Sequence, residues 1–370
     1  MSKAEHSFEE NAGVLGGELS GEGQAAAQPE SAAAAPEPPP SAALTQIVLG
    51  CLVSQAVCVA AKLGVADLLA GGPKGAGELA EATGTHARSL YRLLRTLASV
   101  GVFRELPEKR FELTPMAEAL RSDAPGSLRD AAIFMGEEWH WRVWGHTIES
   151  VRTGGSAWER AHGSEIFPWF AAHPSESAAF DRAMTSFSNL ATAAVVKAYD
   201  FSGFDTLVDV AGGHGFLLSE ILRAHPSLRG VLFDQPHVIE NAREAFASRG
   251  LGERCELAAG NFFESVPAGA DGYIMKHVIH DWDDERAILI LKNIARAMRE
   301  DGRVLIVEMV LPPANVPHLG KVLDIEMLTS PGGIERTEEE YRELLERAGL
   351  RLARVVPTES PYSVVEAVRK

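Results

Sequence analysis

A glycine-rich turn between two predicted strands constrains the fold of this chain most. Residues 207–215 read LVDVAGGHG, and Asp234 follows nineteen residues after the last of those glycines. The first four residues are typical of a buried parallel strand. Gly212 and Gly213 allow a sharp turn and the close approach of a ligand, whereas Ala211 carries a Cβ, which is tolerated if the φ of this residue is negative. A helix and a second strand ending in Asp234 come next. An acid there can accept both ribose hydroxyls, so the pattern indicates an adenosine-containing cofactor.

Composition and charge narrow the class of protein. A chain of 370 residues can hold two domains and a large core. Its net charge of −16 disfavours non-specific binding to nucleic acid or to an anionic membrane. Cys51, Cys58 and Cys255 are too few for a disulfide framework. The most apolar stretch, residues 44–61, is interrupted by polar residues, and there is no basic, apolar, cleavable N-terminus. We therefore expect no membrane span and a cytoplasmic location.

The N-terminal part of the chain divides into a tail and a helical domain. Residues 1–40 are rich in Ala, Gly, Glu and Pro, which predicts a disordered tail. Residues 41–200 predict a mainly helical domain, beginning with a helix over 42–69 that is interrupted at Leu63 and Gly64. Residues 78–114 read as helix, turn, helix and a short hairpin, which is a winged-helix pattern.

Strands and helices alternate in residues 201–370. Strands are expected at 206–211, 230–233, 255–259, 272–276, 303–309, 351–356 and 363–368, with helices at 216–225, 236–248, 284–299 and 338–348. This alternation predicts a parallel, doubly wound sheet. The connection between the last two strands is so short that we expect them to pair antiparallel.

Five motifs of this region occur in an order that points to one family. They read DVAGGHG from Asp209, FDQPHV around Asp234, MKHVIHDWDD from Met275, EMVLP from Glu308 and GGIERT from Gly332. Together, over residues 42–370, they resemble the S-adenosylmethionine-dependent O-methyltransferases of small molecules, which include plant caffeate and flavonoid enzymes and bacterial natural-product tailoring enzymes. The resemblance implies an α/β fold, with a Rossmann-like seven-stranded class I methyltransferase domain preceded by an α-helical winged-helix dimerisation domain. It also implies a homodimer formed through that domain, S-adenosylhomocysteine as a product, and no metal.

His280 is the candidate general base. It ends a strand-to-loop segment at the carboxyl edge of the predicted sheet, where ligands of open α/β sheets bind. A phenol has a pKa of about 10, so a neutral imidazole suits the removal of its proton. The resemblance implies that Glu308 and Glu335 flank the base and that Asp281 helps to hold the acceptor oxygen. Alternatively, Glu308 forms a strand-end salt bridge, Glu335 is a loop charge or a helix cap, and Asp281 caps the helix that begins near Asp283.

A metal site is an alternative use of the same segment. His277 lies three residues before His280, and Asp281, Asp283 and Asp284 follow. No further His or Cys cluster supports such a site, so we expect no metal.

The resemblance and the glycine turn together give a candidate cofactor site. Its residues are Asp209, Gly212, Gly213, Asp234, Gly260, Asn261, Phe262, Lys276 and Trp282. Asn261 stands where the family carries an Asp that accepts from the adenine amine, and its amide oxygen can still accept. Phe262 and Trp282 are expected to sandwich the adenine, or else to be core residues. Lys276 is expected near the cofactor, or else as a surface charge.

The acceptor is expected between the helices that precede residue 204 and a loop at residues 323–333. Candidates are Trp139, Trp141, Phe170, Phe180, Met184, Asn189, His277, Met327 and Ser330. Aromatic and Met side chains suit a flat aromatic molecule, although each could instead be a core residue and Asn189 could be exposed.

The sequence thus predicts methylation of a hydroxyl, of phenolic type, on a small aromatic secondary metabolite. Two alternatives keep the cofactor: methylation of nitrogen, and a non-methylating decarboxylase or hydroxylase. A third is a DNA-binding regulator that uses Arg88, Arg92 and Arg95 of the winged helix. The acidic balance of the chain and the leucines of the same helix favour a packing role for it, so we expect no nucleic-acid partner.

Overall fold

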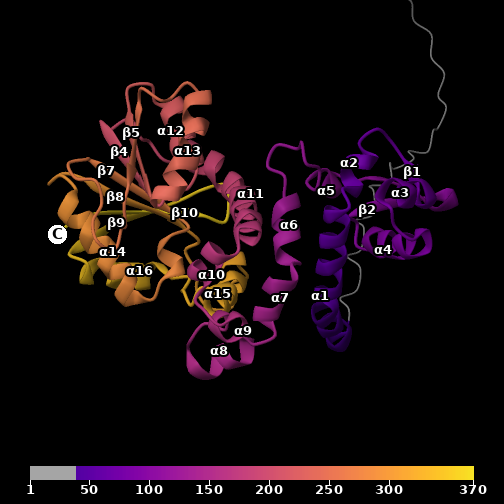
Figure 1. Cartoon of the computed structure of the whole chain (residues 1–370). Coiled ribbons are helices and arrows are strands. Elements are labelled where there is room, and N and C mark those ends of the chain that lie inside the picture. Colours follow the sequence, from indigo (N-terminus) through magenta and orange to yellow (C-terminus); the bar gives the residue numbers. More distant parts are fainter. Residues whose placement is uncertain (1–38) are drawn as a thin grey trace, which may run out of the picture. The chain divides into compact units, whose positions relative to one another are not determined.

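The structure is a computed structural model that describes residues 39–370, and the tail predicted for residues 1–40 lies outside the described residues apart from its last two positions (Figure 1). The elements up to residue 200 are α1 (Pro40–Lys62), α2 (Val65–Leu69), β1 (Lys74–Gly75), α3 (Ala76–Thr83), α4 (Ala87–Ser99), β2 (Phe103–Leu106), the 3-10 turn η1 (Pro107–Lys109), β3 (Arg110–Leu113), α5 (Pro115–Glu118), α6 (Arg129–Met135), α7 (Glu138–Trp144), α8 (Thr147–Thr153), α9 (Trp158–His162), α10 (Ile166–Ala172) and α11 (Pro174–Ala198). The elements that follow are β4 (Thr206–Val210), α12 (Phe216–Ala224), β5 (Arg229–Asp234), α13 (Pro236–Ser248), β6 (Cys255–Ala259), β7 (Gly272–Lys276), η2 (Ile279–Asp281), α14 (Asp284–Ala297), β8 (Arg303–Glu308), α15 (Leu319–Thr329), α16 (Glu338–Arg347), β9 (Leu350–Pro357) and β10 (Ser363–Arg369).

The C-terminal half contains the predicted doubly wound sheet. Its seven strands lie in the order β6-β5-β4-β7-β8-β10-β9. The strands from β4 to β8 pair parallel, and β10 pairs antiparallel with both β8 and β9, as the short final connection predicted. This is the seven-stranded class I methyltransferase arrangement that the resemblance implied.

Two hydrophobic clusters cover the two faces of this sheet, since alternate residues of each strand point to opposite faces. Val208 and Met275 belong to the cluster that contains residues of α14 and α16. Leu207 and Ile274 belong to the cluster with α11, α12 and α13. Figure 1 shows α12 and α13 on one side of the strands and α14 and α16 on the other. Because β4, β7 and β8 pair parallel, their carboxyl ends lie together at one edge of the sheet.

The winged-helix pattern is present before residue 120. β2 and β3 form the predicted hairpin, and β1 adds a third strand that the sequence analysis did not predict. Leu90, Leu94 and Leu97 of α4 are buried, while Arg88, Arg92 and Arg95 are exposed. The apolar face of α4 thus packs against its own domain, as expected.

Helix α1 has an unusually apolar surface. It ends at Lys62, and α2 follows after the predicted break. Apolar side chains are exposed along its length: Leu44, Ile47, Val48, Leu49, Leu52 and Val59. Within the described part of the chain, α1 is also the helix whose length and composition would allow it to cross a membrane, which we did not expect. Length and composition alone do not establish a span, because helices at protein interfaces share them.

Two local features differ from what the sequence indicated. Residues 319–329 form the helix α15, where a loop was expected over 323–333. The start of this helix carries no Ser, Thr, Asp or Asn cap; instead the His318 ring accepts from the Gly320 amide at 3.1 Å, so the usual start signal is missing. Ala211 has φ of +57° rather than a negative φ. Its amide donates to Phe233 O at 2.8 Å, and this bond to β5 holds the turn in a conformation that glycine would adopt more easily.

Candidate active site

Two adjacent strands of the sheet carry the candidate base and one of its acids. β7 ends at Lys276 and leads into η2, which carries His280. β8 pairs with β7 and ends at Glu308. Both side chains therefore emerge at the carboxyl edge of the sheet, as the sequence predicted.

Glu308 holds the backbone of the turn that carries the base. Its carboxylate is fully buried, and Oε1 accepts from the amides of Val278 and Ile279, each at 3.1 Å, and of His280 at 3.4 Å. The other oxygen, Oε2, lies 3.2 Å from His280 Nδ1. Glu308 is therefore bound to the turn and to the imidazole, and it does not form a strand-end salt bridge with a Lys or Arg.

Glu335 makes the shorter contact with the imidazole. Its Oε1 lies 2.8 Å from His280 Nδ1, and its side chain is 1% exposed. The sequence alternative of a solvated loop charge is therefore wrong, and the helix cap that it could have provided is supplied by Thr337. Because both acids lie at Nδ1, the neutral form of the imidazole carries its hydrogen on Nδ1. The lone pair of the neutral ring is then on Nε2.

The electrostatics of this cluster favour a protonated imidazole. Burial alone would lower the pKa of His280, but Glu308, the hydrogen bond from Glu335 and Asp281 together raise it to about 10. Burial raises the pKa of Glu308 to about 7 and that of Asp281 to about 6. The pKa values of His280, Glu308 and Asp281 are thus set by one another within one buried group.

Asp281 lies on the other side of the imidazole ring. Its Oδ1 is 3.7 Å from His280 Nε2. The helix cap that was its alternative role belongs to Asp283, whose side chain accepts from Arg286 N at 2.8 Å. Asp281 and Nε2 of the base therefore share the side that is not occupied by the two glutamates.

The residues proposed for an alternative metal site make other contacts in the structure. Asp283 caps α14, and Asp284 forms an ion pair with Arg336 at 2.9 Å. The His277 ring lies against Tyr362, with 4.6 Å between ring centroids. Among the residues that the structure describes, the group with suitable ligand atoms is His280, Glu308 and Glu335, and these side chains already contact one another.

Arg336 is a buried residue of this site that the sequence analysis missed. It is 1% exposed and donates to the carbonyl oxygens of Ile279 at 3.2 Å and Trp282 at 3.0 Å, on either side of the base. It also donates to Ile334 O at 3.2 Å, next to Glu335. One guanidinium thus connects the two segments that carry the base and its acid. An arginine directly after a predicted catalytic acid was the available signal.

The glycine turn and Asp234 meet at the neighbouring strand ends. Asp234 Oδ2 accepts from Gly213 N at 2.8 Å, and a Cβ on Gly213 would meet nothing within 4 Å. A Cβ on Gly212 would lie 2.5 Å from a methyl of Leu232, so this glycine is required for packing. The turn therefore has free space for a ligand beside Gly213, whereas the space beside Gly212 is filled by protein.

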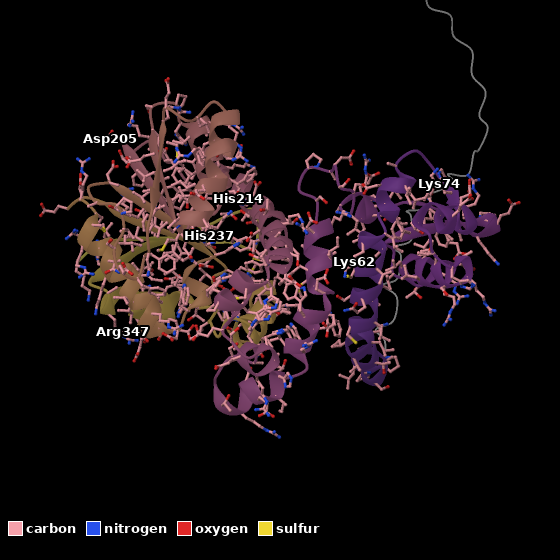
Figure 2. The ribbon with its side chains drawn as sticks, in the orientation of Figure 1. Lys62, Lys74, Asp205, His214, His237 and Arg347 are labelled. Carbon is pink, nitrogen blue, oxygen red and sulfur yellow. The ribbon has the colours of Figure 1, made fainter. Side chains whose placement is uncertain are left out.

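Asp181 of α11 adds a further charge near the glycine turn. Desolvation raises the pKa of Asp181, while His214 and His237 oppose that shift, so all three are in electrostatic contact. Both histidines are labelled in Figure 2, one in the glycine turn and one near the start of α13. The sequence analysis did not include Asp181 in the site.

Lys276 is held between the sheet and α11. It donates to the hydroxyls of Ser188 and Thr192, the second at 3.3 Å. Desolvation lowers the pKa of Lys276 to about 8, and burial raises the pKa of Asp209 to about 7. Asp209 Oδ2 is buried without a hydrogen-bond partner in the described chain. The surface-charge alternative for Lys276 is therefore wrong.

The segment after β6 departs in part from expectation. Asn261 is exposed, and its side chain accepts from Phe263 N at 3.0 Å and donates to Glu264 at 3.1 Å. Phe262 and Trp282 meet edge to face, with centroids 6.0 Å apart and an interplanar angle of 72°. This arrangement leaves no parallel slot between them, so the expected sandwich is not formed. A Cβ on Gly260 would lie 2.5 Å from the Phe233 ring, which explains that glycine by packing.

An aromatic cluster forms one wall of the predicted acceptor region. Trp139 is 9% exposed, and its ring centroid lies 5.7 Å from that of Phe170. The Phe170 ring stacks on the Phe180 ring, with 4.7 Å between centroids. Met184 packs on the same cluster as a partly buried residue, whereas Trp141 is held by a bond to Met135 O at 2.8 Å. Trp139 and Phe170 are thus largely core, and Phe180 and Met184 are the partly accessible members.

The other acceptor candidates are His277, Met327, Ser330 and Asn189. The His277 ring is 5.6 Å from the His280 ring, and His277 has φ of +56°. Met327 O accepts from Gly333 N at 2.9 Å, and Ser330 is buried at the end of α15. The side chain of Asn189 lies outside the described residues.

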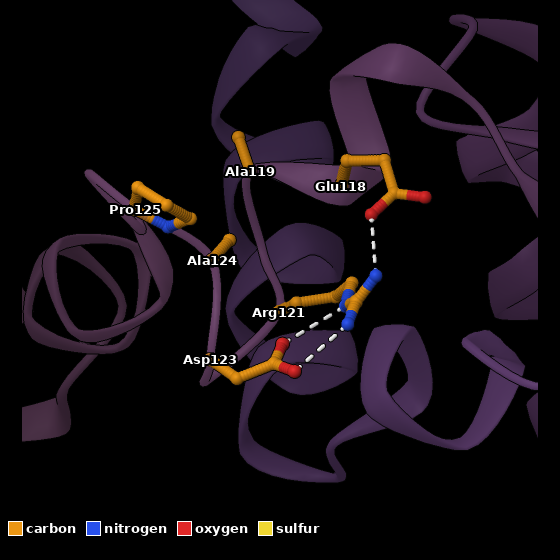
Figure 3. Close-up of a pocket in the computed structure, with 6 residues that line it drawn as sticks. All are labelled: Glu118, Ala119, Arg121, Asp123, Ala124 and Pro125. Atoms are coloured by element: carbon orange, nitrogen blue, oxygen red, sulfur yellow. Dashed lines mark hydrogen bonds and ion pairs between the residues drawn. The ribbon is translucent and has the colours of Figure 1, made fainter.

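A surface hollow of the N-terminal domain is not part of this site. It is lined by Glu118, Ala119, Arg121, Asp123, Ala124 and Pro125 (Figure 3). Its arginine pairs with Glu118 at 2.9 Å and Asp123 at 2.8 Å, so its charges satisfy one another.

Comparisons with known proteins agree with this fold. Residues 144–351 match the O-methyltransferase domain family, and residues 45–123 match the O-methyltransferase dimerisation domain. A phenazine O-methyltransferase, PhzM, from Lysobacter antibioticus is 47% identical over 329 residues, covering 89% of this chain and 96% of that protein. The crystal structure of LaPhzM has a TM-score of 0.85 at 46% identity and covers 90% of this chain and all of that chain. The chain belongs to the O-methyltransferase family, and it is a methyltransferase of natural-product tailoring type.

The relatives do not all methylate oxygen. A phenazine-1-carboxylate N-methyltransferase from Pseudomonas aeruginosa is 33% identical over 326 residues, covering 88% of this chain and 96% of that protein. Another solved relative, NcsB1, was determined with S-adenosylmethionine and a hydroxylated naphthoic acid; it has a TM-score of 0.74 at 36% identity and covers 86% of this chain and 96% of that chain. Family membership therefore shows that the chain is a methyltransferase. It does not by itself show whether oxygen or nitrogen receives the methyl group.

Proposed function

We propose that this chain transfers the methyl group of S-adenosylmethionine to a phenolic hydroxyl of a small aromatic secondary metabolite, with His280 as general base. The observation that carries the proposal is the placement of Glu335 and Glu308 on Nδ1 of His280, at 2.8 and 3.2 Å. This arrangement leaves Nε2 as the proton acceptor, beside Asp281.

The residues around the glycine turn fit S-adenosylmethionine. The open side of Gly213 admits a ligand to the backbone, Asp234 can accept from ribose hydroxyls, and the unpartnered Asp209 Oδ2 and the ammonium of Lys276 can meet its amino-acid group. When bound, the cofactor supplies an electrophilic methyl carbon on a sulfonium.

The reaction needs little from the protein beyond position and proton removal. S-adenosylmethionine held by these residues would supply its methyl group to an acceptor oxygen and would leave as the neutral thioether S-adenosylhomocysteine. The hydroxyl proton passes to Nε2 of His280, and the two glutamates stabilise the imidazolium that results. Glu308 fixes the turn and Glu335 fixes the ring.

We further propose that the chain acts as a homodimer in the cytoplasm. The dimerisation-domain match includes most of α1, whose exposed leucines suit a protein interface. Methylation of nitrogen is the second candidate function, favoured by the phenazine N-methyltransferase relative.

The first test is calorimetric titration of the purified protein with S-adenosylmethionine and S-adenosylhomocysteine, followed by a screen of phenolic and aromatic amine acceptors by mass spectrometry. Micromolar binding and a mass gain of one methyl group on a phenol are expected. A mass gain on amines alone would favour the nitrogen alternative, and an absence of cofactor binding would contradict the proposal.

A further inference from the structure

A buried histidine and a buried glutamate that the proposed reaction does not use meet between α7 and α15. His140 Nε2 donates to Glu326 Oε1 at 2.9 Å, and the His140 side chain is 1% exposed. Trp144 Nε1 and the Ser330 hydroxyl donate to the same carboxylate, each at 2.7 Å. Burial alone would raise the pKa of Glu326, but these hydrogen bonds lower it, so the carboxylate stays ionised.

The second nitrogen of His140 has no hydrogen-bond partner in the part of the chain that the structure describes. In the tautomer whose Nε2 hydrogen Glu326 accepts, the lone pair of the ring is at Nδ1. A buried polar atom without a partner costs about 1–3 kcal/mol. Stability alone therefore does not explain this pair.

The His140 ring lies against the aromatic wall of the acceptor region. Its centroid is 4.5 Å from that of Phe134, and Phe134 meets Phe180 edge to face at 5.8 Å. Phe180 is one of the partly accessible members of that wall. The His140 ring is thus separated by one ring, Phe134, from a side chain expected to contact the acceptor.

Glu326 lies next to the segment that supports the base. It precedes Met327, whose carbonyl oxygen accepts from Gly332 N at 2.8 Å and Gly333 N at 2.9 Å. Gly333 is so close to the base that a Cβ there would lie 1.9 Å from His280 O. The His140–Glu326 pair therefore lies between the aromatic wall and the loop that contacts the base.

We propose that His140 and Glu326 form a second polar subsite of the acceptor pocket. His140 Nδ1 accepts a hydrogen bond from a hydroxyl or amino group that the aromatic acceptor carries away from the methylated oxygen, and Glu326 fixes the tautomer that makes this possible. The inference rests on the proposed function, because it requires an aromatic acceptor beside His280. It narrows the substrate class to aromatic acceptors with a second hydrogen-bond donor.

The test compares the binding of matched probes in the presence of S-adenosylhomocysteine. The isomers of dihydroxynaphthalene are titrated by calorimetry against the naphthols that lack the remote hydroxyl. Wild-type protein is expected to bind at least one isomer about tenfold more tightly than its naphthol, which is the effect of one hydrogen bond of about 1.4 kcal/mol. The double variant His140→Leu, Glu326→Leu is expected to bind both probes equally.

Two further variants separate this role from a structural one. His140→Phe keeps the ring packing and is expected to lose the same preference, which covers the case in which the double variant does not fold. Glu366→Gln removes a buried carboxylate of β10, which is bonded to Tyr199 and Arg354, and is expected to keep the preference. A preference retained in folded His140→Phe, or absent from the wild type, would overturn the subsite.

Methyl transfer to the same isomers distinguishes the two proposals. A binding preference without methyl transfer to oxygen would contradict the proposed function and support the subsite. Methyl transfer without any preference for the remote hydroxyl would do the opposite.

Discussion

At the scale of single residues, the charge around His280 determines how the enzyme responds to pH. Glu308 and Glu335 favour the protonated ring and raise the pKa of His280 to about 10. A general base must be neutral before it can accept a proton. Activity should therefore increase as pH rises towards that pKa, and removing a negative charge from Nδ1 should move the rise to lower pH.

Glu335→Gln tests this relation. The amide keeps a hydrogen-bond acceptor for Nδ1 but loses the charge, so the rise of kcat/KM with pH is expected at lower pH than in the wild type. The measurement is the pH profile of methyl transfer with a phenolic acceptor. Identical pH profiles for Glu335→Gln and wild type would contradict the electrostatic account.

His280→Ala is expected to lose about 10²–10⁴-fold in turnover, the usual contribution of a general base, at unchanged affinity for S-adenosylhomocysteine.

Asp234 provides a second test at this scale. Its carboxylate accepts from the amides of Gly213 and Gln235, and it is the proposed ribose contact. Losing hydrogen bonds to a charged group costs about 1.5–3 kcal/mol, so Asp234→Ala should weaken S-adenosylhomocysteine binding about 10–100-fold by calorimetry. Asp205→Ala, an exposed acid just before β4, should bind normally. Equal dissociation constants for the two variants would refute the ribose assignment.

At the scale of elements, one arginine sets the relation between η2 and the segment that precedes α16. Arg336 donates to Ile279 O, Trp282 O and Ile334 O, and it pairs with Asp284 at the start of α14. Lysine is a single point donor and cannot satisfy these acceptors together. Arg336→Lys should therefore displace the base and Glu335 relative to each other.

The expected result for Arg336→Lys is a fall in kcat well beyond any change in cofactor affinity, together with a lower Tm. Arg347→Lys is the matched control, because Arg347 contacts the same Asp284 from the surface, at 3.4 Å. Steady-state kinetics, calorimetry and thermal unfolding are compared for both. If kcat falls only in proportion to the folded fraction, Arg336 is a structural residue and does not position the base.

At the scale of the whole molecule, the sequence predicted what depends on local pattern and left out what depends on packing. The strands and the helices between them have clear periods, so β6 and β7 were predicted with their observed bounds. The motifs also contained His280, Glu308 and Glu335, which the structure brings together. Contacts between segments distant in sequence, such as His140 with Glu326 or Lys276 with Ser188, leave no mark on either segment alone. The edge-to-face arrangement of Phe262 and Trp282 was missed for the same reason, whereas the helix α15 was missed because it lacks the usual start signal.

The last prediction concerns assembly of the molecule. Leu52 is 63% exposed on α1, within the region that matches the dimerisation domain. Burying a Leu side chain is worth about 1.5–3 kcal/mol, and burying an unpaired carboxylate costs more. Leu52→Glu should therefore convert a dimer to a monomer, as measured by light scattering, while S-adenosylhomocysteine binding by the sheet domain persists. Leu289→Glu places the same charge at an exposed leucine of α14 and should leave the mass unchanged. A Leu52→Glu protein of unchanged dimeric mass would show that the interface lies elsewhere on the chain.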